Sequence, residues 1–283
     1  MERGIVLITG TSSGFGLLTS VALAKEGYHV VAAMRDLGKS GRLLQAAQEA
    51  GVPEGRIEVV RLDVTEMESI PGVMAGILDK HGRIDVLINN AGYAKGGFVE
   101  DVPLEAWREQ FETNVFGLIA MTKAVIPSMR ERRAGKIVNI SSISGRLGFP
   151  AMGPYSASKF AVEGFSEALR LEMLPFGVDV VLVEPAAYKT DIWDKGLEGM
   201  EVDLASPYVD LMRGMNKMAR QSAERGGDPQ EVVALIQSLL QTPAPRLRHP
   251  IGQGVKQMLF LRHFLPSNSV ERIMIKRLQG GKR

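Results

Sequence analysis

The fold is decided by the stretch Ile5-Val6-Leu7-Ile8-Thr9-Gly10-Thr11-Ser12-Ser13-Gly14-Phe15-Gly16. The apolar run predicts a buried strand, the glycines predict a tight turn, and the residues from 17 to 25 predict a helix. Glycine lets a pyrophosphate approach the backbone, and the helix directs free N–H groups and its positive dipole end at the anion. The stretch therefore predicts a dinucleotide-binding strand, turn and helix.

The glycine spacing itself is a weaker signal. Gly10, Gly14 and Gly16 stand as Gly-x-x-x-Gly-x-Gly, which departs from the G-x-G-x-x-G dinucleotide fingerprint. The strand and helix that the fingerprint requires are present on either side. A plain structural turn is the alternative, so support must come from the rest of the chain.

Outward from this stretch, short β-branched runs alternate with longer helical patterns. Strands are expected at 5–8, 29–34, 57–62, 86–89, 136–140 and 179–183, and helices at 17–25, 38–49, 69–81, 104–132 and 155–174. Because parallel strands need crossover helices, this alternation predicts an α/β fold with a doubly wound, Rossmann-type parallel sheet in one domain, 1–283. A ligand should lie at the carboxyl ends of the strands, where Gly14, Asp63, Asn89 and Ser142 fall.

A pair of side chains suited to proton transfer follows in Tyr155-Ser156-Ala157-Ser158-Lys159. On a helix, Tyr155 and Lys159 share a face one turn apart. A free tyrosine has a pKa of about 10, and a nearby positive charge favours the phenolate and lowers that value. Tyr155 can then serve as a general acid or base. Alone, the same spacing is a common accident on amphipathic helices.

Together these features resemble the classical short-chain dehydrogenase/reductase family. The resemblance includes Asn89-Asn90-Ala91-Gly92 after an apolar run and Asn114 in Thr113-Asn114-Val115-Phe116-Gly117, and it extends from about Gly4 to Thr190. The segments Tyr155 to Gly164 and Leu174 to Val178 are similar to the branch that holds the 17-beta-hydroxysteroid and retinol dehydrogenases. Similarity to a branch does not identify a substrate.

The resemblance implies hydride transfer between a nicotinamide cofactor and a carbonyl or secondary alcohol. In that scheme Tyr155 exchanges the proton, Ser142 stabilises the substrate oxygen, Lys159 lowers the tyrosine pKa and holds the ribose, and Asn114 supports a water. Ser142 is chosen over Ser141 by its distance from Tyr155 in the sequence. The cofactor-binding residues that the resemblance implies are Gly10, Ser12, Ser13, Gly14, Phe15, Gly16, Arg35, Asp63, Val64, Asn90, Ala91, Gly92, Tyr155, Lys159, Pro185, Tyr188 and Thr190.

One departure from the family lies after Pro185, where Ala186 replaces the usual glycine and leaves the conformation of that turn open. Proline alone also fits a simple strand end.

Two signals compete over the cofactor at the end of the second strand. Asp36 lies about where a carboxylate binds the ribose 2′-hydroxyl of NAD, whereas Arg35 would place a guanidinium near the 2′-phosphate of NADP. Charge-assisted guanidinium–phosphate contacts are strong, and an aspartate can turn to solvent, so NADP(H) is preferred and NAD(H) is the alternative. An ordinary surface Arg–Asp pair remains a third interpretation.

Composition excludes several functions. With 34 basic and 32 acidic residues among 283, the chain lacks the basic field that nucleic-acid binding requires. It has no cysteine, and its four histidines show no metal-ligand spacing, so no metal is expected. The glycine motif starts too early to leave room for a leader, and no apolar run reaches the length of a membrane span. We therefore expect a cytoplasmic protein.

Beyond Thr190 the motifs fade, and residues 191–227 are expected to form a substrate lid. This segment carries Trp193, Leu197, Met200, Tyr208, Leu211, Met212, Met215 and Met218. A methionine-rich lid, completed by Phe98, Phe149 and Met152, indicates a bulky apolar substrate such as a steroid, retinoid or lipid-like alcohol or ketone, although such a stripe is also typical of plain core.

Residues 250–283 form a basic, amphipathic C-terminal extension. We expect it to pack on the body or on a second subunit, with peripheral membrane contact as the alternative.

Self-association is expected through the helices at 104–132 and 155–174, giving a homodimer or homotetramer, as is usual in the resembling family. Their apolar positions are Phe111, Val115, Leu118, Ile119, Thr122, Val125, Phe160, Phe165, Ala168 and Leu169. The alternative is that both helices bury these residues against their own sheet.

Two other functions stay open at this stage: a 3-oxoacyl-thioester reductase on the same scaffold, and a dinucleotide-sensing regulator without turnover. The regulator would not need serine, tyrosine and lysine together.

Overall fold

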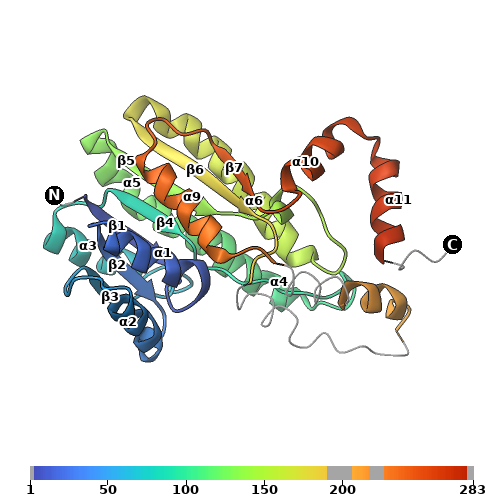
Figure 1. The fold of residues 1–283 in the computed structure, drawn as a ribbon, viewed down its shortest axis with the longest axis horizontal. Coiled ribbons are helices and arrows are strands. Elements are labelled where there is room, and N and C mark those ends of the chain that lie inside the picture. Colours follow the sequence, from blue (N-terminus) through green and yellow to red (C-terminus); the bar gives the residue numbers. More distant parts are fainter. Residues whose placement is uncertain (1–2, 190–205, 217–225, 279–283) are drawn as a thin grey trace.

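The computed structural model describes residues 3–189, 206–216 and 226–278. Its centre is a seven-stranded sheet in the order β3-β2-β1-β4-β5-β6-β7 (Figure 1). Every pair of neighbouring strands is parallel. The strands are β1 (Ile5–Thr9), β2 (His29–Met34), β3 (Ile57–Arg61), β4 (Val86–Asn89), β5 (Gly135–Ile140), β6 (Val178–Pro185) and β7 (Arg248–Ile251). The expected doubly wound, Rossmann-type sheet is thus confirmed.

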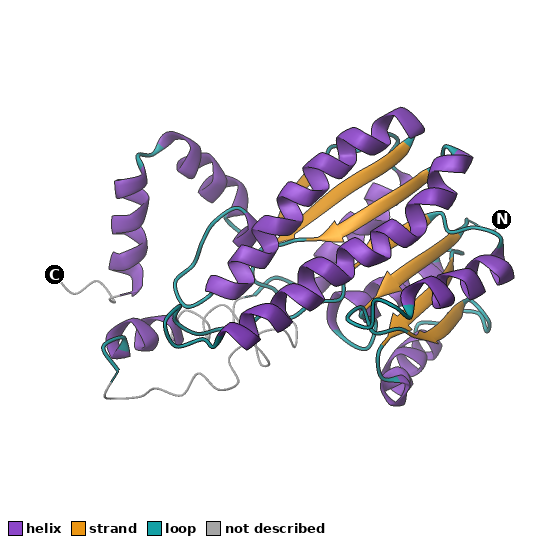
Figure 2. Ribbon diagram, turned by 180° about the vertical axis from the view of Figure 1, so that it is seen from behind, coloured by secondary structure: helices purple, strands orange, loops and turns teal. Residues whose placement is uncertain are grey.

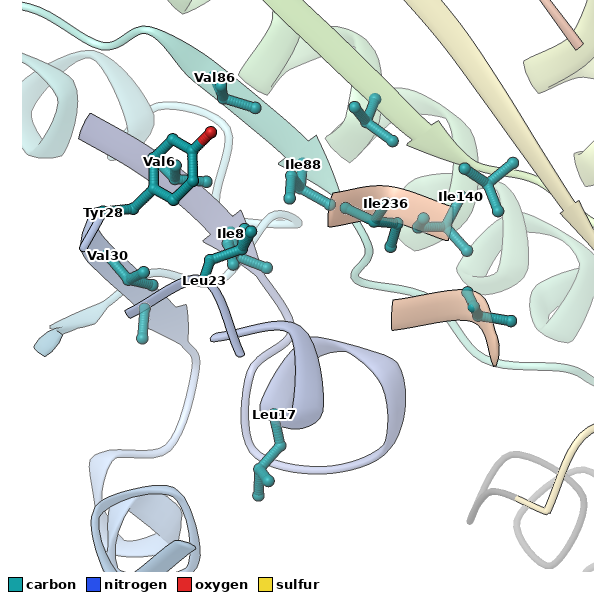
Figure 3. Close-up of a cluster of buried hydrophobic side chains, with 14 of the residues drawn as sticks. Val6, Ile8, Leu17, Leu23, Tyr28, Val30, Val86, Ile88, Ile140 and Ile236 are labelled. Carbon is teal, nitrogen blue, oxygen red and sulfur yellow. The ribbon is translucent and has the colours of Figure 1, made fainter. Parts of the chain in front are cut away.

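Alternation of side chains along each strand explains why helices cover both faces. Val6 and Ile8 of β1 pack with the helices α1 (Gly14–Lys25), α2 (Ser40–Glu49) and α9 (Pro229–Gln241), and Figure 3 shows part of this cluster. Ile5 and Leu7 point to the other face, where α3 (Ile70–His81), α5 (Gly117–Arg132) and α6 (Gly153–Met173) lie (Figure 2). Each face therefore buries its own apolar layer.

Two elements were missing from the sequence prediction. The strand β7 pairs with β6 at the edge of the sheet, and its Pro250 obscures the strand pattern in Arg248-His249-Pro250-Ile251. The helix α9 follows a run that reads as a linker. Asp228 is in fact its N-cap and accepts a hydrogen bond from the backbone N–H of Gln230 at 2.9 Å, with Pro229 in the first turn.

The helix expected at 104–132 is interrupted. It consists of α4 (Leu104–Phe111), a π-helical turn at Glu112–Phe116 and α5. Asn114 lies inside the π-helical turn. Such turns often occur at functional sites because they redirect a side chain without ending the helix.

The chain leaves the sheet after β7 and forms α10 (Val255–Phe264) and α11 (Ser267–Leu278), which extend away from the body in Figures 1 and 2. The base of α10 is anchored, because Val255 packs with Ile143 and Leu147. Of the lid expected at 191–227, residues 191–205 and 217–225 lie outside the described part. Within the described ranges, no helix combines the length and the apolarity that crossing a bilayer requires.

Candidate active site

The turn between β1 and α1 is closed so tightly that Gly10 and Gly16 leave no room for a Cβ. Gly10 has a φ of 70°, and a Cβ there would lie 2.8 Å from the Cα of Ala91. A Cβ on Gly16 would collide with the carbonyl of Gly10 and would lie 2.5 Å from Nδ2 of Asn90. Gly14, with a φ of 55°, begins α1. The turn thus brings a helix amino terminus to the end of β1, which suits an anion.

Asn90 ties this turn to the end of β4. Its Nδ2 donates to the carbonyls of Thr9 and Gly10 at 2.9 and 3.0 Å. The Thr9 hydroxyl accepts from the backbone N–H groups of Asn90 and Ala91, both at 3.0 Å. Asn90 therefore acts through the backbone of the glycine turn, a structural use that its sequence motif does not reveal.

Arg35 and Asp36, the two alternative cofactor ligands at the end of β2, differ in their surroundings. Met34 ends the strand, so Arg35 is the first residue beyond it, and both Arg35 and Asp36 are exposed. The Asp36 carboxylate accepts a hydrogen bond from the backbone N–H of Gly38 at 2.9 Å and lies 3.8 Å from Lys39. Burial raises the pKa of Tyr93, which follows β4, and the positive charge of Arg35 opposes that rise. Arg35 is therefore exposed directly after the strand, whereas the Asp36 carboxylate accepts a hydrogen bond within its own loop.

Asp63 and Val64 follow β3 at the same edge of the sheet. The Asp63 carboxylate accepts hydrogen bonds from the backbone and hydroxyl of Thr65 at 3.0 and 2.8 Å. Val64 is buried against Gly117, where an added Cβ would lie 2.8 Å from the valine side chain. Close packing of α5 on this loop fixes the position of Val64.

Tyr155, Lys159 and Ser142 meet at the centre of this edge, and all three are less than a tenth exposed. Nζ of Lys159 donates to the carbonyl of Ile140 at 2.8 Å and lies 5.8 Å from the centre of the Tyr155 ring. Ser142 begins the turn after β5, and its Oγ accepts from the backbone N–H of Ser144 at 3.1 Å. The residues of the expected catalytic group are thus brought together.

Burial dominates the ionisation of this group. It raises the pKa of Tyr155, while the hydrogen bond of the phenol with Ser142 lowers it. Burial lowers the pKa of Lys159 to about 8, and the negative charge of Glu163 partly opposes this. That Lys159 lowers the Tyr155 pKa stays a prediction, and its ammonium donates to the Ile140 carbonyl at 2.8 Å. Ser142 is the residue that favours the phenolate.

The choice between the two serines is decided by their partners. Oγ of Ser141 donates to the Glu163 carboxylate at 2.6 Å. Ser142 alone of the two interacts with Tyr155. The different partners of the two serines support the prediction that Ser142 is the one that serves the site.

Asn114 reaches this site from the π-helical turn. Its Nδ2 donates to the carbonyl of Tyr93 at 3.0 Å and to Oγ of Ser158 at 3.1 Å, and its Oδ1 accepts from the backbone N–H of Tyr93 at 3.1 Å. An added Cβ on Gly92 would lie 3.1 Å from the same Oδ1. Asn114 thus fixes the loop after β4 to the helix that carries Tyr155 and Lys159.

A buried charge network behind the serines escaped the sequence analysis. Glu163 accepts from Ser141 and from Nε of Arg248 at 2.8 Å. Arg248 lies 3.4 Å from Glu184, which also pairs with Arg146 at 3.1 Å. Burial, followed by the charge of Glu163, raises the pKa of Glu184 to about 7. The helical spacing of Lys159 and Glu163 was visible in the sequence, but partners from β6 and β7 were not.

The surroundings of Tyr155 on the open side are apolar. Tyr155 packs with Ala94 and Met152, and Phe149 and Met215 lie against them. Met215 also contacts a second cluster in which the Tyr208 ring stacks on Phe98 with centroids 4.2 Å apart. Residues 206–216 thus connect the expected lid segment to the tyrosine.

The segment after β6 is held by its neighbours. Pro185 ends the strand, and the methyl group of Ala186 lies against Gly252, where an added Cβ would be 2.6 Å away. The alanine that departs from the family pattern is accommodated by this glycine. The Tyr188 side chain is buried against Phe15, and its hydroxyl donates to Glu231 at 3.0 Å. Thr190 lies outside the described residues.

Comparison with known proteins agrees with this geometry. The family model described as short chain dehydrogenase matches residues 4–200. An uncharacterized oxidoreductase, YusZ of Bacillus subtilis, is 44% identical over 98% of this chain and 99% of its own. The 3-ketodihydrosphingosine reductase of Bacteroides thetaiotaomicron is 38% identical over 96% of each chain, and bovine retinol dehydrogenase 8 is 38% identical over 94% of this chain and 86% of its own.

Solved structures of similar proteins contain bound NADP or NAD. The structure of ElxO with NADP bound is 26% identical, has a TM-score of 0.75 and covers 91% of this chain and 100% of its own. A Burkholderia phymatum short chain dehydrogenase/reductase in complex with NAD is 26% identical, has a TM-score of 0.80 and covers 96% of this chain and 95% of its own. The matched family model and these relatives show that the chain belongs to the classical short-chain dehydrogenase/reductase family of NAD(P)-dependent oxidoreductases.

Proposed function

We propose that this enzyme interconverts a ketone or aldehyde and the corresponding alcohol on a bulky apolar substrate, with NADP(H) as the preferred cofactor. The observation that carries the proposal is the apolar cluster around Tyr155, built from Ala94, Phe149, Met152 and Met215. A proton-transferring phenol in apolar surroundings favours a hydrocarbon-like substrate over a sugar, whose hydroxyls would lack partners there.

The dinucleotide fits the edge of the sheet. The glycine turn leaves a space that any Cβ at Gly10 or Gly16 would fill, next to the open amino terminus of α1. In this proposal the turn residues 10–16 hold the pyrophosphate, Asp63 and Val64 the adenine, and residues 90–92 the adenosine ribose. Lys159 holds the nicotinamide ribose, and residues 185–190 hold the carboxamide. When bound, the nicotinamide supplies or accepts the hydride.

The side chains at the reacting carbonyl have separate tasks. Tyr155 donates a proton to the substrate oxygen during reduction and accepts one during oxidation. Ser142 donates a hydrogen bond to the same oxygen and stabilises the charge that develops there. Asn114 is a positioning residue, because its bonds to Tyr93 and Ser158 hold the loop after β4 against α6. Burial of the pair keeps bulk water from the proton transfer.

Arg35 supports the preference for NADP(H). It lies directly after β2 and is exposed, whereas one oxygen of the Asp36 carboxylate accepts a hydrogen bond from the N–H of Gly38. An arginine at this place can pair with the 2′-phosphate that only NADP carries.

The relatives support a lipid-like substrate. Their names include a 3-ketodihydrosphingosine reductase, a retinol dehydrogenase and a rat estradiol 17-beta-dehydrogenase that is 36% identical over 88% of this chain. These substrates share a large hydrocarbon body with one reacting oxygen. Residues 206–216, which reach Tyr155 through Met215, would cover that body.

A substrate panel tests the proposal. The purified enzyme is assayed by nicotinamide absorbance with 3-ketodihydrosphingosine, retinaldehyde, estrone, a short 3-oxoacyl thioester and a ketose, each with NADPH and NADH. The proposal expects kcat/KM to be highest for one of the first three, with NADPH. Preference for the thioester would favour the 3-oxoacyl reductase instead, and preference for the ketose would contradict the apolar site.

A further inference from the structure

Three possible metal ligands meet at the amino ends of the strands, roughly 17 Å along β2 from the cofactor edge. His29 is the first residue of β2, Glu58 lies on β3 and His81 is the last residue of α3. In the sheet register Glu58 is opposite Val31, so its side chain projects on the same face as His29. The helix α3 covers that face and ends beside them.

The geometry of this cluster suits a small metal ion. Nε2 of His81 lies 2.9 Å and Nε2 of His29 lies 3.6 Å from the same carboxylate oxygen, Oε2 of Glu58. All three ligand atoms lie within 4.8 Å of one another. Ligands about 2.0 to 2.1 Å from a tetrahedral zinc ion are about 3.3 Å apart. Small side-chain movements would therefore bring all three to coordination distance.

The chemical state of the cluster also favours a metal. Nε2 of His29 is buried and, among the described residues, has no hydrogen-bond partner. A neutral imidazole nitrogen without a hydrogen-bond partner is a ready metal ligand. Lys80 pairs with the other oxygen of Glu58, Oε1, at 2.8 Å, and Oε2 is the oxygen that faces both imidazoles. Lys80 is 59% exposed and can turn its charge to solvent.

We propose that His29, Glu58 and His81 bind one divalent transition-metal ion of the zinc type, with water completing the coordination. Two imidazole nitrogens and one carboxylate oxygen suit zinc, whereas calcium and magnesium prefer oxygen ligands alone. The ion would join β2, β3 and α3 and act as a structural brace. Sequence spacing does not reveal the site, because its ligands come from two strands and a helix.

Titration with the metal alone tests the site. The full chain is treated with a chelator, dialysed and titrated with ZnCl2 by calorimetry. The expected result is one ion per chain with a Kd in the micromolar range or below, and a rise in Tm of at least about 3 °C at saturating zinc. Glu58→Gln and His81→Ala should each weaken binding at least about tenfold. His249→Ala, which removes a histidine outside the cluster, should leave binding unchanged.

A second measurement on the unmutated protein keeps the test valid if the variants fold poorly. Cobalt(II) at one equivalent should give visible absorption of a four-coordinate site, and zinc should abolish it. Absence of stoichiometric zinc binding, absence of that absorption, or equal affinity in the wild type and a folded His81→Ala variant would each overturn the proposal.

Discussion

At the scale of single residues, the site depends on which partner each side chain takes. Ser141 and Ser142 are adjacent, yet Ser141 bonds Glu163 and Ser142 bonds Tyr155. Arg35 and Asp36 are adjacent, yet the aspartate serves its own loop. The sequence analysis favoured Ser142 and Arg35 in these two pairs. Their partners come from other elements, so only the folded arrangement separates them.

Arg35 allows a test of cofactor choice. Arg35→Ala should weaken NADPH binding at least about tenfold and leave NADH binding nearly unchanged, because only NADPH carries the 2′-phosphate. Calorimetric titration with both cofactors measures this. Arg108→Ala, on an exposed arginine of α4 paired with Glu105, is the matched control and should change neither affinity. An equal loss for both cofactors would make Arg35 a general structural residue.

Glu184 predicts a dependence of stability on pH. Its pKa is raised to about 7, above the value of about 4.3 in an unfolded chain. The stability it contributes is therefore present below about pH 4.3 and is lost as the pH rises through about 7. Glu184→Gln is neutral at every pH. Its free energy of unfolding, relative to that of the wild type, should therefore rise by on the order of 2 kcal/mol between pH 5 and 8. Urea unfolding at both pH values measures the gap, and a constant gap would contradict it.

At the scale of elements, the strands and helices that build the site were predictable and their contacts were not. β2 and β4 begin and end where the sequence places them, because buried parallel strands are continuous apolar runs bounded by turn residues. The edge strand β7 was missed because Pro250 disguises it. The π-helical turn at Asn114 leaves no periodic signal, since one extra residue barely disturbs the apolar pattern.

The glycine turn is the element whose geometry is most restrictive. Gly16→Ala should abolish detectable dinucleotide binding, because its Cβ would collide with the Gly10 carbonyl and the Asn90 side chain. Gly76→Ala, on α3 with open space around it, is the matched control and should be neutral or stabilise by up to about 1 kcal/mol. Fluorescence titration with NADPH compares them. Normal affinity in Gly16→Ala would show that the turn does not hold the cofactor.

At the scale of the whole molecule, the helices expected at a subunit interface expose only part of their apolar surface to a second subunit. Val115, Leu118 and Val125 are buried against the protein's own sheet, so most of the expected stripe on α5 is already used. On α6, Phe160, Gly164, Ala168 and Glu172 follow one another at helical spacing and are exposed. Phe116 and Phe160 are 47% and 43% exposed. The remaining apolar surface still favours a two-fold pairing through α6.

Light scattering at micromolar concentration tests this assembly. The wild type should be a dimer or tetramer of the 30.8 kDa chain, and Ala168→Arg should shift it toward the monomer because two like charges would face each other across the axis. Arg213→Ala, outside α6, serves as the control. A wild-type monomer with full activity would contradict the pairing.

The central claim is that Tyr155 transfers the proton in a reaction on an apolar carbonyl. It is tested by the kcat of Tyr155→Phe on the best substrate of the panel with NADPH, with Tyr28→Phe, a buried tyrosine of the opposite layer, as the control. The account predicts a loss in kcat of at least about a hundredfold for Tyr155→Phe, with NADPH affinity retained, and near-normal turnover for Tyr28→Phe. Turnover within about threefold of the wild type in a folded Tyr155→Phe enzyme would contradict it.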